Sequence, residues 1–355
     1  MFEWETRLTT RDDNRIVRPF EWGEEWTTHW PLVEKTQHAA LPPADATSAE
    51  HERFFQELNQ RIIAQSDDFF AYAPPTDFQL STRVLPGERG ATHLVEFTSP
   101  VRTPHPVNNL VSARWYPAKK HNRKAVVLLP HWNSKPHSYI ALCQILAKLG
   151  LSTLRLSLPY HDRRLPADTQ RSDYAVSSNI GRTMDATRQA VIDTRAALDW
   201  LQSLGYEEFG IVGTSLGSCY AFLTSAHDDR IKVNAFNHAS TYFSDVVWTG
   251  QSTRHVRAGI EPMMDLERLR KVWGAISPMN YFHKFAAKQK KMLVIYATYD
   301  LTFLPEYSRQ VIEQFAAHRI DHQVRVLPCG HYSTGETPFK FMDGWWIGKF
   351  LKTAL

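Results

Sequence analysis

The feature that most constrains the fold is an alternation of short apolar runs with segments of helical periodicity, which begins near residue 92. The run at residues 125–129 is continuously apolar, as a strand covered on both faces requires. The segment at residues 138–149 places apolar residues at helical spacing and ends at Gly150, a residue suited to a left-handed C-terminal cap. Strands that alternate with helices predict a mostly parallel sheet with helices on both faces.

The same pattern predicts the other core elements. Two short strands, at residues 93–98 and 110–116, come first, and no useful helix separates them. Further strands are expected at residues 151–158, 209–213, 231–236, 292–297 and 324–327. Further helices are expected at residues 182–204, from about residue 216, and at residues 305–318 and 339–351. The predicted fold class is a doubly wound α/β domain over residues 91–355.

Two regions fall outside the alternation. Residues 1–90 mix aromatic and charged residues around one helical pattern at residues 48–65, so they are predicted to form an extension packed on the core. This aromatic content leaves open an interface within one chain or within a homo-oligomer. About residues 240–289 interrupt the alternation between two late strands. An insertion there lies above the carboxyl ends of the sheet, where open α/β folds bind ligands, so it is predicted to be a lid.

Composition excludes several classes of protein. An apolar fraction of 43% and a charged fraction of 22% are ordinary for a folded chain. The net charge of +4 is dispersed, which argues against a nucleic-acid or membrane partner. No apolar stretch approaches the length of a membrane span, and residues 1–15 lack a signal-peptide core. Three cysteines without CxxC spacing favour a reducing compartment, so the expected location is the cytoplasm.

Residues 213–217 read Gly-Thr-Ser-Leu-Gly, which matches the pattern G-x-S-x-G. A chain of this length shows the pattern by chance about one time in ten. Here it lies between a predicted strand and a helix that starts at once, which is the setting of a nucleophile elbow. Gly213 and Gly217 would leave room for the crossing backbone and for substrate. This context favours Ser215 as a nucleophile over an ordinary glycine-bounded turn.

A serine hydroxyl is a poor nucleophile near neutral pH, so it needs a base and a third group that holds the base. Asp300 follows the predicted strand at residues 292–297, and His331 follows the last strand. Any one of the sixteen histidines is more often structural than catalytic, and an aspartate at a strand end is commonly a turn residue. The joint placement of three groups, in the order serine, acid, histidine, favours catalysis.

With these residues the chain resembles the α/β-hydrolase fold superfamily, in its serine-nucleophile branch, over about residues 92–355. The resemblance implies an oxyanion hole formed by the backbone N–H of Leu216 and by a donor in the loop after the strand at residues 125–129. Where the family usually has His-Gly before that donor, this chain has Pro130 and His131. Trp132 is therefore the predicted donor by position, with His131 as the second choice. The side chains of His131 and Asn133 could also bind substrate or order the loop.

The predicted activity is hydrolysis of a small-molecule carboxylic ester through an acyl-enzyme on Ser215, with His331 as base and Asp300 holding it. The same triad serves peptidases, thioesterases, acyltransferases and carbon–carbon bond hydrolases, which remain alternatives. A non-catalytic relative that binds a ligand under the lid is another. The sequence has no zinc-type ligand cluster and no glycine-rich nucleotide motif, so neither a metal nor a cofactor is expected.

Three more segments could contribute to the site. Arg163 and Arg164 could bind a carboxylate, although a solvated loop paired with acidic neighbours is the commoner case. His238 follows the strand before the lid and could face the site, although a structural histidine is the commoner case. The apolar residues of the lid could form an acyl pocket or only attach the lid to the core: Tyr242, Phe243, Trp248, Met263, Met264 and Trp273.

Overall fold

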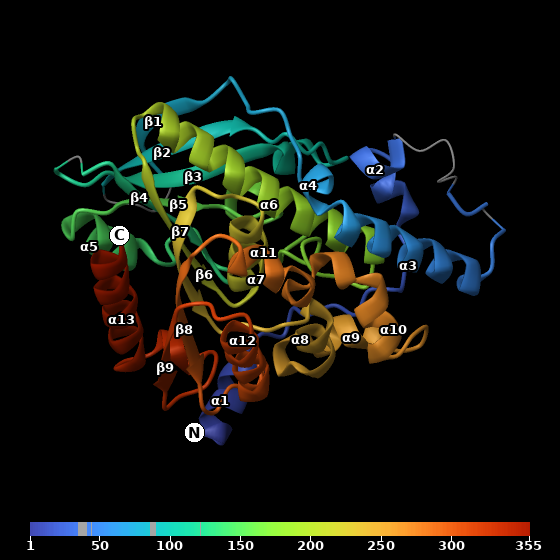
Figure 1. The fold of residues 1–355 in the computed structure, drawn as a ribbon. Helices are drawn as coiled ribbons and strands as arrows, with labels where there is room; N and C mark the ends of the chain where they lie inside the picture. The colour runs from blue at the N-terminus through green and yellow to red at the C-terminus, as the bar shows by residue number, and fades with distance from the viewer. Residues whose placement is uncertain (35–40, 44, 86–89, 121) are drawn as a thin grey trace.

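The computed structural model describes residues 1–34, 41–43, 45–85, 90–120 and 122–355. Within these residues the chain forms a nine-stranded sheet in the order β1-β2-β3-β5-β4-β6-β7-β8-β9 (Figure 1). The antiparallel part contains β1 (Gln79–Val84), β2 (Ala91–Thr98) and β3 (Leu110–Tyr116), which also pairs antiparallel with β5. The remaining neighbours pair parallel: β4 (Lys124–Leu129), β5 (Ser152–Leu156), β6 (Glu208–Thr214), β7 (Ile231–Asn237), β8 (Lys291–Ala297) and β9 (His322–Leu327). The predicted fold class is confirmed.

Helices cover both faces of this sheet (Figure 1). One face carries α5 (Ile140–Lys148) and α13 (Phe339–Ala354), and the other carries α6 (Ile180–Ser203), α7 (Leu216–Ala226) and α12 (Pro305–Ala317). The side chains of β4 alternate between the two cores: Val126 and Leu128 pack with α5 and α13, whereas Val127 and Leu129 pack with α6 and α7. This double burial explains why the β4 sequence is continuously apolar.

Local signals set the limits of several helices. The side chain of Asn179 accepts a hydrogen bond from the N–H of Arg182 at 2.8 Å, which begins α6. Gly150 follows α5 with a φ of +92°, so it forms the left-handed helix end that its position predicts. A capping box of Thr47 and Glu50 begins α3 (Ser48–Ala64).

The edge strand β1 is the sheet element that the sequence pattern missed. It pairs antiparallel with β2, so the sheet begins inside the region predicted as an extension. The reason is its solvent-exposed position: Leu80 and Val84 are both more than half exposed, and none of its residues is buried. An edge strand without a buried face lacks the alternation that reveals a strand in a sequence. Residues 35–40, 44 and 86–89 of the predicted extension lie outside the described residues.

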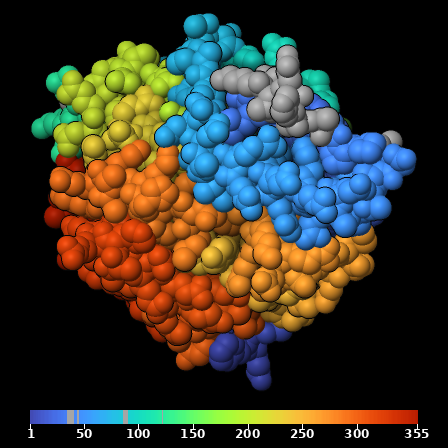
Figure 2. Space-filling view, turned by 45° about the vertical axis from the view of Figure 1, so that its right-hand side comes forward, coloured from blue at the N-terminus to red at the C-terminus, as the bar shows by residue number. Residues whose placement is uncertain are grey.

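The N-terminal region packs on the core and on the insertion. Its described helices are α1 (Phe2–Thr9), α2 (Pro31–Glu34), α3 and α4 (Ser66–Phe69). Asn59 of α3 donates a hydrogen bond to the carbonyl of Val272 and accepts one from the N–H of Ala275, both at 2.7 Å. In Figure 2 the surface of the N-terminal region, in blue, lies directly beside that of the insertion, in orange. The two regions outside the strand–helix alternation therefore stabilise each other.

The insertion between β7 and β8 is a set of short helices. These are α8 (Phe243–Thr249), α9 (Arg254–Ile260), α10 (Leu266–Val272) and α11 (Phe282–Ala286), joined by 3₁₀ turns. Trp273 is fully buried and donates its indole N–H to the carbonyl of Ile180 at 3.3 Å, which attaches the insertion to α6. Among the described residues, none of the helices has both the length and the apolarity needed to span a membrane.

Candidate active site

Ser215 lies in the tight turn between β6 and α7. Its backbone has φ +58° and ψ −121°, a conformation that side-chain-bearing residues rarely adopt. The two flanking glycines make this turn possible, because a Cβ on Gly213 would lie 2.2 Å from the carbonyl oxygen of Gly217. A Cβ on Gly217 would lie 2.3 Å from the carbonyl oxygen of Leu129. The geometry is that of a nucleophile elbow.

The three residues predicted to act together do meet. Nε2 of His331 lies 3.0 Å from Oγ of Ser215, and Nδ1 of His331 lies 2.9 Å from Oδ2 of Asp300. The other carboxylate oxygen of Asp300 accepts the backbone N–H groups of Thr302 and Phe303, at 2.8 and 2.7 Å. One oxygen of Asp300 therefore anchors the side chain, while the other is directed at the imidazole.

The pKa shifts of His331 and Asp300 suit a general base and the carboxylate that orients it. Burial alone raises the pKa of Asp300, but the charge of His331, its hydrogen bond and the imidazole of His238 close by outweigh burial and hold this pKa below its ordinary 3.8. Burial alone lowers the pKa of His331, but the charge and hydrogen bond of Asp300, with the charge of Glu5, raise it above its ordinary 6.5. A raised pKa makes His331 a stronger acceptor for the serine proton.

His238 is a second histidine beside the acid. Its Nδ1 lies 2.8 Å from Oδ2 of Asp300 but out of hydrogen-bond alignment, and its ring centre lies 4.4 Å from that of His331. Burial and the charge of His331 lower its pKa despite the nearby carboxylate, so it is neutral at neutral pH. His238 therefore faces the site, which is the less common of the two positions considered for it from the sequence. Ligand atoms of these three side chains lie within 4.8 Å of one another, so they could hold a metal if their mutual contacts were given up.

The loop after β4 lies against the elbow, because Gly217 touches the carbonyls of Leu129 and Pro130. In the described part of the chain, the backbone N–H groups of Leu216 and Trp132 have no hydrogen-bond acceptor. Two unpaired N–H groups at this place suit an oxyanion hole, and the assignment stays a prediction. Nδ1 of His131 lies 2.6 Å from the hydroxyl of Tyr139, and burial lowers its pKa to about 3, so this side chain is neutral and bound within the protein.

The side chain of Asn133 orders the same loop. Its Oδ1 accepts the N–H of Ser172 at 2.8 Å, and its own backbone N–H bonds Nε2 of His161 at 3.1 Å. The indole N–H of Trp132 donates to the carbonyl of Ser172 at 2.9 Å. These bonds favour loop ordering, rather than substrate binding, for the Asn133 side chain.

Glu5 of α1 is a site residue that sequence reasoning missed. Its carboxylate is fully buried and accepts the backbone N–H groups of Tyr332 and Ser333, at 2.7 and 3.1 Å, and the hydroxyl of Ser333 at 2.9 Å. A Cβ on Gly330 would lie 2.2 Å from this carboxylate. Glu5 therefore anchors the loop that carries His331 through three hydrogen bonds. Nothing in the pattern of residues 1–15 distinguishes Glu5 from the acidic residues near it.

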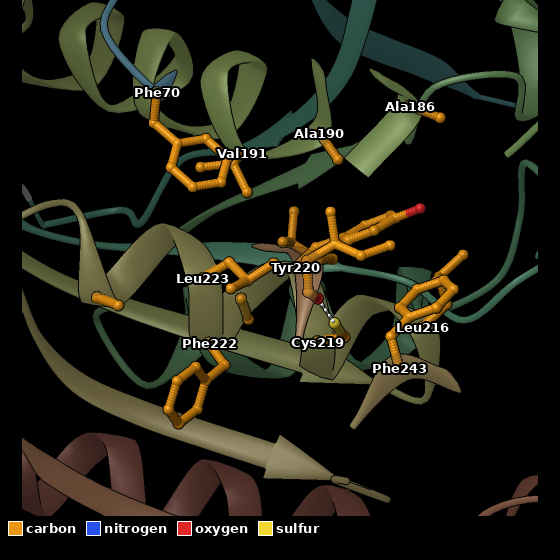
Figure 3. Close-up of a cluster of buried hydrophobic side chains, with 14 of the residues drawn as sticks. Phe70, Ala186, Ala190, Val191, Leu216, Cys219, Tyr220, Phe222, Leu223 and Phe243 are labelled. Atoms are coloured by element: carbon orange, nitrogen blue, oxygen red, sulfur yellow. Dashed lines mark hydrogen bonds between the residues drawn. The ribbon is translucent and has the colours of Figure 1, made fainter. Parts of the chain in front are cut away.

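A cavity of about 1380 Å³ opens onto Ser215 and His331. The predicted lid contributes Tyr242, Phe243 and Val246 to its wall, so part of the insertion does border the site. Figure 3 shows the buried cluster next to it, with Leu216 of α7 and Phe243 at the same end. Trp273 and Met264 are buried in the core instead. Some of the apolar residues of the lid therefore border the cavity, and others attach the lid to the core.

Arg164 corrects the expectation of a solvated loop at this position. Its side chain is fully buried and pairs with Asp193 at 2.7 Å, while two of its nitrogens donate to the carbonyl of Asn108. Arg163 remains partly exposed, 3.6 Å from Glu96. Acidic partners for these arginines were expected from the sequence. The burial of Arg164 was not expected, because the sequence does not show that α6 brings Asp193 to this loop.

Comparisons with known proteins agree with the fold of this chain. The profile of a family described as "Alpha/beta hydrolase domain containing 18" matches residues 96–250. A search of curated proteins gives no significant match. Acetyl xylan esterase 1 from Thermoanaerobacterium sp. is similar in structure, with a TM-score of 0.60, 14% identity and coverage of 94% of this chain and 99% of that one.

Two further solved structures are similar. An acetyl xylan esterase from Paenibacillus sp. R4 has a TM-score of 0.60 and 13% identity over 89% of this chain and 98% of that one. An acylaminoacyl peptidase from Pyrococcus horikoshii has a TM-score of 0.58 and 12% identity over 78% of this chain, and the match spans only 42% of the peptidase. Sheet order, elbow and structural likeness together show that this chain has the α/β-hydrolase fold.

Proposed function

We propose that this protein is a serine hydrolase that cleaves a carboxylic ester through an acyl-enzyme on Ser215. The single observation that carries the proposal is the continuous contact from Ser215 Oγ through His331 to Asp300, at 3.0 and 2.9 Å. Hydroxyl, imidazole and carboxylate in this order form the arrangement that activates a serine near neutral pH.

The reaction follows from these contacts in two steps. His331 takes the proton of Ser215 as Oγ attacks the ester carbonyl, and Asp300 stabilises the imidazolium that forms. The N–H groups of Leu216 and Trp132 stabilise the oxyanion, and the imidazolium then protonates the departing alcohol. In the second step His331 takes a proton from water as the water attacks the acyl group. Collapse of that intermediate releases the acid and returns the proton to Ser215.

The structural similarity of the whole chain to two esterases favours an ester over an amide as the substrate. The two acetyl xylan esterases match this chain over nearly their entire length, whereas the acylaminoacyl peptidase matches over less than half of its own. The match is one of fold, so it supports the ester class without specifying the alcohol or acyl group.

A non-catalytic binding protein is the second candidate. The specific observation in its favour is the oxyanion loop, where Pro130 and His131 stand in place of the usual His-Gly. A poorly formed oxyanion hole would leave the triad contacts intact but remove most of the transition-state stabilisation.

Covalent labelling separates these two candidates. A fluorophosphonate probe should modify Ser215 in the folded protein, and Ser215→Ala should show no labelling and no hydrolysis of 4-nitrophenyl butyrate. Ser203→Ala is the matched control, because Ser203 lies exposed at the end of α6, outside the cavity, and its hydroxyl bonds only the carbonyl of Trp200. Wild-type protein that is folded yet neither labelled nor active would establish the binding protein. Hydrolysis of 4-nitrophenyl butyrate but not of the matching anilide would establish the ester preference.

A further inference from the structure

The wall of the cavity beyond Trp132 is basic. Arg171 lines the cavity, and its guanidinium lies over the Trp132 ring, 5.6 Å from the ring centre. Only 8% of the Arg171 side chain is exposed, and its Nη1 donates to Oδ1 of Asn14 at 3.1 Å. Because Trp132 carries a predicted oxyanion donor, Arg171 lies one side chain away from the place where a scissile carbonyl would bind.

Other basic residues stand behind Arg171. The ring of His255 is parallel to that of Trp132, with ring centres 5.7 Å apart. Burial, together with the charges of Arg171, Arg15 and Arg18, lowers the pKa of His255 to about 4. His255 is therefore neutral at neutral pH, and the positive charge of this wall comes from the arginines.

Two carboxylates only partly neutralise these arginines. Asp173 lies 3.4 Å from Nε of Arg171 and 3.7 Å from Nη2 of Arg18. Asp12 lies 3.6 Å from Nη1 of Arg171 and 3.8 Å from Nη2 of Arg15. These separations exceed those of strong charge-assisted hydrogen bonds, and three guanidinium groups share two carboxylates. The wall keeps an excess of positive charge next to the cavity.

The same wall holds polar atoms without partners. Within the described residues, the buried Nε atoms of Arg15, Arg18 and Arg171 make no hydrogen bond, and neither does either ring nitrogen of His255. Oδ1 of Asp173, which lies 3.4 Å from Nε of Arg171, also accepts no hydrogen bond. Buried polar groups in folded proteins are nearly always satisfied, so an unpaired donor on Arg171, which lines the cavity, with further unpaired donors packed behind it, indicates room for an additional acceptor.

We propose that Arg171 on this wall, backed by Arg15, Arg18 and His255, forms a subsite for an anionic group of the substrate, a carboxylate or a phosphate. The proposal rests on the proposed function, because it places this group on the same molecule as the ester. A planar guanidinium recognises such oxyanions through paired hydrogen bonds. The preferred substrate is then an ester that carries a negative charge a few bonds from its scissile carbonyl.

A matched pair of substrates tests the proposal. The acyl groups of 4-nitrophenyl butyrate and 4-nitrophenyl hemisuccinate differ in that a carboxylate replaces the terminal methyl group. We expect wild-type kcat/KM to be at least about tenfold higher for the hemisuccinate at low ionic strength, as one charge-assisted contact provides. The 3-phosphonopropionyl ester extends the series to a phosphate-like charge, and 4-acetoxybenzoate against its methyl ester places the charge on the alcohol side. Equal rates within every pair would overturn the proposal.

Variants then locate the effect. Arg171→Gln should lower kcat/KM for the preferred acidic ester at least about tenfold more than for its neutral partner, and Arg171→Lys should restore part of the difference. Arg325→Gln, which removes an exposed arginine on β9, should leave both rates unchanged. An equal loss on both esters in Arg171→Gln would assign Arg171 a structural role and overturn the subsite.

Wild-type protein alone provides a further readout if Arg171→Gln does not fold. Succinate or inorganic phosphate should inhibit hydrolysis of the neutral ester competitively, while sodium chloride at the same ionic strength should not. Identical behaviour of all three salts would contradict an oxyanion subsite. If the protein neither cleaves esters nor reacts with the fluorophosphonate, the proposed function fails on its own. Equilibrium dialysis of phosphate against wild type, Arg18→Gln and Arg325→Gln then still decides whether the wall binds the anion: binding that is weakened in Arg18→Gln but not in Arg325→Gln supports the subsite, and equal binding in all three overturns it.

Discussion

The nucleophile elbow and the histidine loop (residues 330–335) face each other across the active site but are held in place in different ways. The tight turn of the elbow depends chiefly on a contact within a few residues, since Gly213 and Gly217 pack directly against each other between β6 and α7, and the turn then rests on Leu129 at the end of β4. The histidine loop depends on Glu5, which lies 327 positions from Tyr332 in the sequence. The position of the nucleophile is therefore encoded locally, whereas that of the base requires the two ends of the chain to meet.

This difference has a consequence for stability of the site. A tight strand–turn–helix unit is stabilised by the sheet core on which it rests, because β6 and α7 are almost wholly buried. The histidine loop instead relies on three hydrogen bonds from a short helix, and the side chains of Met1, Phe2 and Glu3 at its start are exposed. Local opening of α1 should therefore release His331 before it disturbs Ser215.

The largest effect is expected from the residue that holds the base of the histidine loop. Asp300→Asn should lower kcat for 4-nitrophenyl butyrate by about 10⁴-fold, because an amide neither stabilises the imidazolium nor holds the correct tautomer of His331. Circular dichroism should show an intact fold. Activity within tenfold of wild type would mean that His238, also close to Asp300, or another group holds the base.

Adding one methyl group to Gly217 should distort the tight turn that carries Ser215. Gly217→Ala places a Cβ 2.3 Å from the carbonyl oxygen of Leu129, and backbone on both sides cannot yield easily. We expect a loss of about 1–3 kcal/mol in the free energy of unfolding and a fall in kcat of about 10²-fold. Chemical denaturation and steady-state kinetics measure the two quantities. Gly90→Ala is the control, because its Cβ would meet no atom within 4 Å. Equal behaviour of both variants would mean that the elbow does not require glycine at position 217.

A single change in α1 should disturb the histidine loop without affecting the elbow. Glu5→Gln places an amide where a carboxylate accepts two backbone N–H groups and a hydroxyl. We expect kcat to fall about tenfold with little change in KM, because the base is mispositioned rather than the substrate. Glu3→Gln, on the exposed side of the same helix, should match wild type. If the two variants behave alike, the loop is held by its own contacts.

The pH profile should give the smallest and most specific effect. His331 must be neutral to accept the serine proton, and its pKa is raised above 6.5, so kcat/KM should rise with pH through a midpoint above that value. The groups that face it are Asp300, His238, Glu5 and His131. Removing the Glu5 charge lowers the pKa of His331, so Glu5→Gln should move the midpoint to lower pH. A midpoint unmoved by this change would remove Glu5 from the electrostatics of the base.

Much of the core was predictable because its signals are local. The apolar run of β4 and the glycine after α5 each report their own surroundings, and the structure confirms both elements. Ser215, Asp300 and His331 were predictable because each follows a strand whose end lies at the same edge of the sheet. By contrast β1 was missed, since an exposed edge strand carries no apolar alternation.

Residue spacing alone specified the layered α/β architecture and the three side chains that meet at its edge, because periodicity and turn chemistry act over a few positions. Three contacts depend on tertiary packing. Glu5 binds the histidine loop, His238 lies beside Asp300, and Arg171 lines the cavity next to Trp132. Each of these contacts joins residues far apart in the chain, and such a partner becomes visible only when folding brings the two segments together.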